Sequence, residues 1–237
     1  LRRCDPNLQF FGIGGDRMRD EGVDLFQHER HMSVMGLSEV LRRFSFFRRV
    51  FAETVAILRN QKPDALILVD YPGFNLRVAA RAHALGIKVI YYICPQVWAW
   101  NRARIPRMAR MIDRLLTIFP FEPDVFTGTG LRVDFVGHPL VDEARTARAE
   151  PGIDLPWAGS PRVALLPGSR PHEVRRILPV MRAAAEVVAS RCPSASFLVA
   201  SPSAAIAEIV RTTLTDAGGQ PARWSVVTGC TRQVLRQ

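Results

Sequence analysis

The chain has 237 residues, of which 48% are hydrophobic, enough for one large domain or two smaller ones. Its formal charge of +10 would attract nucleic acid, anionic lipid and phosphorylated substrates alike. Because the arginines are scattered and no nucleic-acid motif is recognisable, we expect no nucleic-acid partner. No apolar run approaches the ~20 residues that span a bilayer, which argues against a membrane-spanning segment within this sequence.

The four cysteines are widely spaced and form no Cys-x-x-Cys pair, so they predict neither a zinc site nor a disulfide framework. They are Cys4, Cys94, Cys192 and Cys230. Reduced cysteines fit a cytoplasmic protein best.

Short apolar runs alternate with helical patterns along the chain, which predicts an α/β fold with parallel sheets and crossover helices. The predicted strands are residues 8–13, 65–69, 87–93, 115–119, 132–136, 163–166, 196–200 and 224–227. Pro, Gly, Asp and Ser gather between residues 149 and 161, which indicates a linker. We therefore expect a first Rossmann-like domain at 1–150 and the start of a second at 151–237.

Residues 37–51 combine an apolar stripe with two pairs of arginines. Val40, Leu41, Phe44 and Phe47 lie at helical spacing, which is typical of a helix packed on a core. Neighbouring arginines are also typical of a helix lying in a membrane interface. We expect one side of this helix to pack on the core, while these four residues stay exposed to contact acyl chains.

Asp70 directly follows the strand at 65–69 and precedes Tyr-Pro-Gly, so we expect it at the lip of a ligand cleft. The alternative is an aspartate that stabilises its own turn through nearby backbone N–H groups. Asn75 is interpreted as a helix cap or a substrate contact.

Two aromatic positions and one histidine also follow predicted strands. Trp98 and Trp100 could form a platform for a sugar or a wall for acyl chains, or they could pack the core beneath the loop. His138 could contact a ligand or stabilise a turn between the domains.

The strand at 163–166 ends in Pro-Gly-Ser-Arg and leads into a predicted helix with Pro171 in its first turn. A glycine turn at a helix N-terminus binds anions, because free N–H groups and the helix dipole point at the ligand. Gly168, Ser169 and Arg170 are therefore candidate phosphate-binding residues. Glu173 could contact a hydroxyl of the donor sugar, or it could simply be a carboxylate that the helix dipole stabilises in the first turn. We prefer the second interpretation.

Five motifs in order along the chain resemble the lipid-A-disaccharide synthase family. They are Phe-Phe-Gly-Ile-Gly-Gly at 10–15, Val-Asp-Tyr-Pro-Gly-Phe-Asn at 69–75, Tyr-Tyr-Ile-Cys-Pro-Gln-Val-Trp-Ala-Trp at 91–100, Phe-Val-Gly-His-Pro at 135–139 and Leu-Leu-Pro-Gly-Ser-Arg at 165–170. The segment Val-Trp-Ala-Trp is the most distinctive. The resemblance implies two Rossmann-like domains of the GT-B type, the second incomplete here, with the family's opening strand and helix also absent.

The resemblance further implies an inverting glycosyltransferase of lipid A biosynthesis. Such an enzyme joins UDP-2,3-diacylglucosamine to 2,3-diacylglucosamine 1-phosphate through a β-1,6 bond and releases UDP. The resemblance also implies that Asp70 is the catalytic base. It implies that Gly168, Ser169 and Arg170 bind the diphosphate. No cofactor or metal is implied, and the sequence has no Asp-x-Asp pair to hold one.

By the same resemblance we expect a cytoplasmic protein attached peripherally to the anionic inner face of the inner membrane. The oligomeric state stays open, and residues 1–237 alone are expected to be inactive. Two alternatives remain. One is another nucleotide-sugar enzyme on this fold, an N-acetylglucosaminyltransferase or a UDP-sugar 2-epimerase, and the other is a non-catalytic membrane-surface module.

Overall fold

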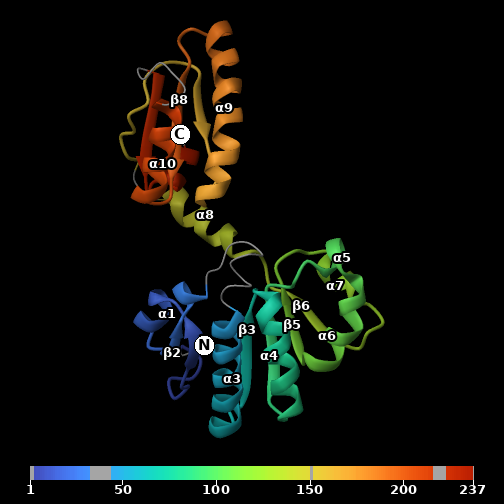
Figure 1. The fold of residues 1–237 in the computed structure, drawn as a ribbon. Helices are drawn as coiled ribbons and strands as arrows, with labels where there is room; N and C mark the ends of the chain where they lie inside the picture. Colours follow the sequence, from blue (N-terminus) through green and yellow to red (C-terminus); the bar gives the residue numbers. More distant parts are fainter. Residues whose placement is uncertain (1–2, 33–43, 150–151, 216–222, 237) are drawn as a thin grey trace. The chain divides into compact units, whose positions relative to one another are not determined.

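The computed structural model describes residues 3–32, 44–149, 152–215 and 223–236. Contacts divide it into two compact units, Leu1–His138 and Pro139–Gln237. In both units the paired strands run parallel and alternate with helices, as predicted (Figure 1).

The first unit begins with a parallel pair of short strands. They are β1 (Phe11–Gly14) and β2 (Asp24–His28), joined by α1 (Asp16–Asp20) and followed by the 3-10 helix η1 (Glu29–His31). Strand β2 was not predicted. Only Leu25 and Phe26 within it are apolar, and two apolar residues form no recognisable run.

The main sheet of the first unit has the strand order β3-β4-β5-β6. Its strands are β3 (Ala65–Val69), β4 (Lys88–Tyr92), β5 (Arg114–Thr117) and β6 (Arg132–Phe135). The helices are α3 (Phe44–Gln61), α4 (Pro72–Ala84), α5 (Val97–Trp100), η2 (Arg102–Arg104), α6 (Ile105–Met111) and α7 (Glu122–Val125). All four strands lie within a few residues of their predicted positions.

The core of this unit lies between the sheet and α4. Val89, Tyr91 and Leu115 are fully buried on one face of the sheet, because alternate residues of a strand point the same way. From α4, Val78 and Ala82 pack against them. Helix α4 contacts β3 and β4, and α3 packs in turn against α4 (Figure 1). This packing fixes the strand ends that carry the site.

The second unit contains a three-stranded sheet in the order β7-β8-β9. Its elements are α8 (Pro139–Ala149), β7 (Arg162–Leu165), α9 (Pro171–Arg191), β8 (Ser196–Ser201), α10 (Ala204–Thr215), β9 (Trp224–Thr228) and α11 (Thr231–Arg236). The predicted helix after Arg170 begins at Pro171 and buries Val174, Leu178 and Ala185.

The boundary between the units falls between His138 and Pro139, before the linker predicted near residue 150. The reason is that α8 packs against α11 of the second unit. Arg232 pairs with Glu143 at 2.7 Å, and the Arg236 guanidinium donates to the Ala147 carbonyl at 3.2 Å. Within the described residues, no helix is both long enough and apolar enough to cross a bilayer.

Candidate functional site

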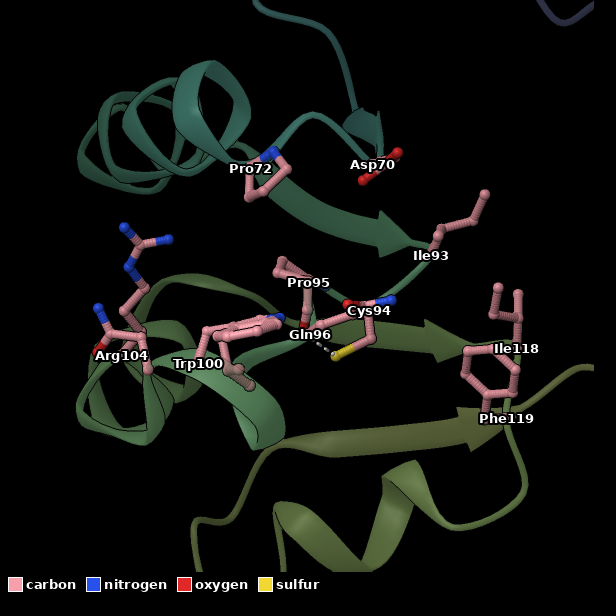
Figure 2. A pocket seen from close by; sticks show the side chains of 12 residues that line it. Asp70, Pro72, Ile93, Cys94, Pro95, Gln96, Trp100, Arg104, Ile118 and Phe119 are labelled. Carbon is pink, nitrogen blue, oxygen red and sulfur yellow. Dashed lines mark hydrogen bonds between the residues drawn. The ribbon is translucent and has the colours of Figure 1, made fainter. Parts of the chain in front are cut away.

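A cavity of about 380 Å³ opens at the carboxyl ends of β3, β4 and β5 in the first unit. In a parallel sheet this edge presents loop side chains to a ligand, and the strand pattern predicted a site there. The polar and aromatic residues lining the cavity include Asp70, Gln96, Trp100, Asn101, Arg104 and Phe119 (Figure 2). Across the described ranges, no three His, Cys, Asp or Glu side chains are grouped so that they could hold a metal ion.

Asp70 is the first residue after β3, and its backbone is left-handed with φ of +45°. Its amide donates to the Tyr92 carbonyl at 3.0 Å. Its carbonyl accepts from the Tyr91 hydroxyl at 2.6 Å and from the Asn75 side-chain amide at 2.7 Å. A non-glycine residue holds this conformation only where its surroundings impose it, which occurs often at functional sites.

The Asp70 carboxylate lines the cavity and accepts no hydrogen bond from any described residue. The turn is therefore held through the backbone rather than through the aspartate side chain, contrary to the turn-stabilising alternative. Asn75 does not cap α4, whose N-cap is Tyr71, and its predicted substrate contact stays a prediction. Its amide donates to the carbonyls of Asp70 and Val69, so it is a positioning residue for the end of β3.

Two buried side chains next to Asp70 stay protonated at neutral pH. Burial, with a smaller effect from the Asp70 carboxylate, raises the pKa of Tyr91 far above its ordinary value, so its hydroxyl remains a donor. Burial, with a smaller effect from Glu122, raises the pKa of Cys94 to about 12. Cys94 lines the cavity as a neutral thiol, and a neutral thiol is a poor nucleophile.

Glu122 is fully buried and organises the loop after β5. Its carboxylate accepts from the amides of Ile118 and Phe119, at 3.2 and 3.0 Å, and from the Trp98 indole at 3.3 Å. A buried carboxylate persists only where such donors compensate its lost hydration. No role could be predicted for Glu122, because burial of the side chain and its contact with Trp98, 24 residues away, arise only in the folded chain.

The two tryptophans of α5 lie in different environments. Trp98 is half-buried and makes an edge-to-face contact with Phe121, with ring centroids 5.1 Å apart, which agrees with the structural alternative. Trp100 is 85% exposed and lines the cavity. The His138 ring lies 5.6 Å from that of Phe119, another residue of the cavity wall.

The glycine turn predicted to bind phosphate lies in the second unit. Gly168 has φ of +125°, and a Cβ there would come within 2.7 Å of Glu173, so a side chain would be strained. The Glu173 carboxylate accepts from the amides of Ser169 and Arg170, at 3.1 and 3.2 Å, and pairs with the Arg170 guanidinium at 2.9 Å. An internal carboxylate thus occupies the donors of this predicted anion site.

These contacts control the ionisation of Glu173. Desolvation alone would raise its pKa, but the Ser169 amide and the Arg170 guanidinium outweigh that effect and lower the pKa below its ordinary value. The side chain is therefore a carboxylate throughout the neutral range. Its role in the structure is to cap α9 and to hold Arg170, which is closer to the helix-dipole interpretation than to a sugar contact.

Two of the four residues predicted to meet acyl chains, Phe44 and Phe47, lie in the first turn of helix α3. Phe44 is 53% exposed, with the Arg48 guanidinium 5.9 Å from its ring centroid. Phe47 is half-buried and contacts Phe46 edge to face. Val40 and Leu41 lie outside the described residues.

Comparison with known proteins shows to which family this chain belongs. Residues 1–220 match the family model described as lipid-A-disaccharide synthetase. The chain belongs to this family. Similar curated relatives include the lipid-A-disaccharide synthase of Geobacter metallireducens, 40% identical over 200 residues, which cover 83% of this chain and 52% of that protein. Lipid-A-disaccharide synthase 1 of Legionella pneumophila (strain Philadelphia 1) is 42% identical over 204 residues, covering 84% and 53%.

Solved structures with a similar fold include proteins bound to UDP or to a UDP-sugar. The Staphylococcus aureus MnaA–UDP structure superimposes with a TM-score of 0.58 at 9% identity, covering 96% of this chain and 70% of that one. The UDP-GlcNAc 2-epimerase of Neisseria meningitidis bound to UDP-GlcNAc gives a TM-score of 0.55 at 11% identity, covering 96% and 66%. At these identities the likeness concerns the fold alone.

These matches confirm the predicted family and the predicted α/β fold of the lipid-A-disaccharide synthases. The chain spans about half the length of the curated relatives it matches.

Proposed function

We propose that the full-length protein is a lipid-A-disaccharide synthase, an inverting glycosyltransferase with a UDP-2,3-diacylglucosamine donor and a 2,3-diacylglucosamine 1-phosphate acceptor. The observation that carries the proposal is the family match over residues 1–220, joined to a cavity that holds an unengaged carboxylate at a strand end. The products are the β-1,6-linked disaccharide 1-phosphate and UDP.

In the proposed reaction Asp70 is the catalytic base. Its carboxylate takes the proton from the acceptor 6-hydroxyl while that oxygen attacks the anomeric carbon of the donor. The carbon–oxygen bond to UDP breaks on the opposite face, which inverts the configuration, and the electron pair leaves with UDP. The backbone bonds from Tyr91 and Asn75 support this role, because they hold Asp70 in place without using its carboxylate.

The glycine turn of the second unit is the proposed diphosphate site. Departure of UDP builds negative charge, which the Arg170 guanidinium and the amides of Ser169 and Arg170 would stabilise. These same amides now bind the Glu173 carboxylate, which supports an affinity of the turn for anions. The turn requires glycine at position 168, since φ is +125° and a Cβ there would come within 2.7 Å of Glu173.

The membrane assignment belongs to the same proposal. Exposed Phe44 and the arginines beside it on α3 suit an anionic bilayer surface, as does the formal charge of +10. A peripheral position on the inner face of the inner membrane would bring the cavity to its acylated substrates. Trp98 and His138 lie next to the cavity wall, and the proposal gives neither of them a catalytic role.

Comparing donors in the full-length protein tests this function. Turnover of diacylated UDP-glucosamine to a disaccharide, with little turnover of the unacylated donor, is the expected result. Conversion of UDP-N-acetylglucosamine to its 2-epimer, or transfer from the unacylated donor at the same rate, would favour a soluble nucleotide-sugar enzyme. Failure to bind UDP in a calorimetric titration would favour the non-catalytic membrane module.

A further inference from the structure

Arg104 faces the cavity from the side opposite to the proposed base. It is the last residue of η2, and Figure 2 shows Asp70 and Arg104 at opposite ends of the cavity, with Pro95 and Trp100 between them. The cavity is therefore polarised, with a carboxylate at one end and a guanidinium at the other. The reaction as proposed above uses only the carboxylate end.

The Arg104 guanidinium is exposed and has no partner of opposite charge among the described residues. Within the described ranges it forms neither an ion pair nor a side-chain hydrogen bond, whereas Arg114, on the neighbouring strand β5, pairs with Asp134 at 2.8 Å. The amide side chains of Gln96 and Asn101 line the same cavity and are likewise unengaged with the rest of the described chain. Three polar side chains thus line the cavity without a side-chain partner in the part of the chain that the structure describes.

The aromatic wall beside these groups fits a sugar ring. Trp100 is 85% exposed although it is the largest side chain in the lining, and an exposed indole face at a cavity suits stacking against a pyranose. A volume of about 380 Å³ lies in the range of small-molecule sites. The occupant that these features describe is a sugar with an anionic group at one end.

We propose that Arg104, assisted by the amides of Gln96 and Asn101, binds the phosphate of a sugar 1-phosphate acceptor and orients its ring across Trp100. This proposal rests on the proposed function and deepens it. In an α-linked glucosamine 1-phosphate the phosphate on C1 and the hydroxymethyl group on C5 flank the ring oxygen and lie on opposite faces of the ring. In the proposed pose the ring lies between the two side chains, with the phosphate toward Arg104 and the 6-hydroxyl toward Asp70.

Charge also selects this orientation over its reverse. Turning the acceptor around would bring its phosphate against the Asp70 carboxylate, and like charges at close range repel. Arg104 is thus a specificity residue for the phosphorylated acceptor, distinct from Arg170, which serves the donor diphosphate in the other unit.

The decisive experiment compares two acceptors in the full-length protein, 2,3-diacylglucosamine with and without the 1-phosphate. Arg104→Ala should lower kcat/KM for the phosphorylated acceptor by about ten- to a hundredfold, the usual effect of losing one charged hydrogen bond. It should leave kcat/KM for the unphosphorylated acceptor and KM for the donor nearly unchanged. Arg104→Lys should recover part of the loss, because it restores the charge but not the planar fork of donors.

Arg107→Ala is the matched control, since Arg107 is exposed on α6 and does not line the cavity. It should leave the ratio between the two acceptors at the wild-type value. An equal fall for both acceptors in Arg104→Ala would overturn the proposal, and so would an equal change of the ratio in Arg107→Ala. Weaker binding of Arg104→Ala to phosphatidylglycerol vesicles with an unchanged acceptor ratio would assign Arg104 to lipid head groups instead.

A binding measurement separates this proposal from the function on which it rests. If the wild-type protein forms no disaccharide with either acceptor, the proposed function fails. Phosphorus NMR with glucosamine 1-phosphate then tests the subsite alone. Line broadening by the wild-type protein that Arg104→Ala abolishes and Arg107→Ala retains supports the phosphate subsite, and equal broadening by all three proteins overturns it.

Discussion

At the scale of single residues, the central element of the account is Asp70, the proposed base. The Tyr91 hydroxyl and the Asn75 side-chain amide donate hydrogen bonds to the Asp70 carbonyl, while the Asp70 side chain lies in the cavity. Asp70→Asn keeps the shape of the side chain and removes its basicity. We expect kcat to fall by about 10²–10⁴ while UDP-sugar binding persists, as measured by steady-state kinetics and calorimetry.

The control for this substitution is Asp64→Asn, at an exposed aspartate just before β3, at the other end of the same strand. It should leave kcat near the wild-type value. Should Asp70→Asn weaken donor binding in proportion to kcat, Asp70 would be a binding residue and not the base.

Arg170 is expected to act on the transition state for UDP departure. Replacing Arg170 with Ala should lower kcat/KM by on the order of a hundredfold, corresponding to ~3 kcal/mol for a charged hydrogen bond in a catalytic site. Arg175→Ala, on the exposed side of α9, is the control and should have little effect. Normal kinetics in a folded Arg170→Ala protein would show that this side chain serves only to pair with Glu173.

Glu173 should make the stability of the second unit depend on pH in one direction. Its lowered pKa means that the folded protein favours the carboxylate. This contribution is fully present above the ordinary pKa of 4.5 and is lost as the pH falls through the lower, folded-state pKa. Glu173→Gln should therefore lower the melting temperature at pH 7, and the difference from wild type should shrink below about pH 4. A difference that stays constant with pH would contradict this account.

Cys94 offers a chemical test of the cavity environment. Because burial holds its pKa near 12, almost none of it is thiolate at pH 7.5. A maleimide should therefore modify the exposed Cys4 and Cys192 well before Cys94, as followed by peptide mass spectrometry. Preferential labelling of Cys94 in the native protein would show that the thiol is more exposed or more acidic than the structure indicates.

At the scale of elements, helix α3 combines two surfaces. Val50 is buried against the core, whereas Phe44 near the start is exposed beside Arg48. Phe44→Ser should reduce binding to anionic vesicles and leave the melting temperature unchanged. An aromatic contact fully buried in lipid is worth about 1.5–3 kcal/mol, so a single substitution should be visible in a vesicle assay.

Val50→Ser provides the contrast for this helix. It places a hydroxyl in the core and should lower the melting temperature clearly. Added salt should weaken vesicle binding of the wild-type protein, since exposed arginines attract head groups through screened interactions. If Phe44→Ser lowers the melting temperature as Val50→Ser does, the start of α3 is a core element and the interfacial assignment is wrong.

The elements also show what sequence patterns can and cannot predict. Strands with continuous apolar runs, such as 65–69 and 196–200, lie where they were predicted. Strand β2 has polar ends and was missed, and α8 was assigned to the first domain because its contacts with α11 come from residues about ninety positions away. Short-range periodicity carries no information on such contacts.

The same distinction applies to the site. Asp70 and Trp100 could be placed at the cleft because each directly follows a strand or its turn. Tyr91, Glu122 and Arg104 gained no role from the sequence, since their importance depends on partners, or on the lack of partners, in three dimensions. The internal pairing of Glu173 with Arg170 was likewise visible only in the folded turn.

At the scale of the whole molecule, the family match covers most of this chain, while the chain spans about half of its relatives. The two units carry separate parts of the proposed reaction, with the base and acceptor cavity in the first and the diphosphate turn in the second. Under this proposal catalysis requires both units, so the product formed by the full-length protein tests them together.

The most direct test is the structure of the product formed by the full-length protein from a donor labelled with ¹³C at its anomeric carbon. Incubation with 2,3-diacylglucosamine 1-phosphate in vesicles should release UDP and give a disaccharide whose labelled carbon is β-linked to the acceptor O6, as read by NMR. The Asp70→Asn protein should give almost none of it. An α linkage, a different linkage position, or undiminished product from Asp70→Asn would contradict an inverting transfer with Asp70 as its base.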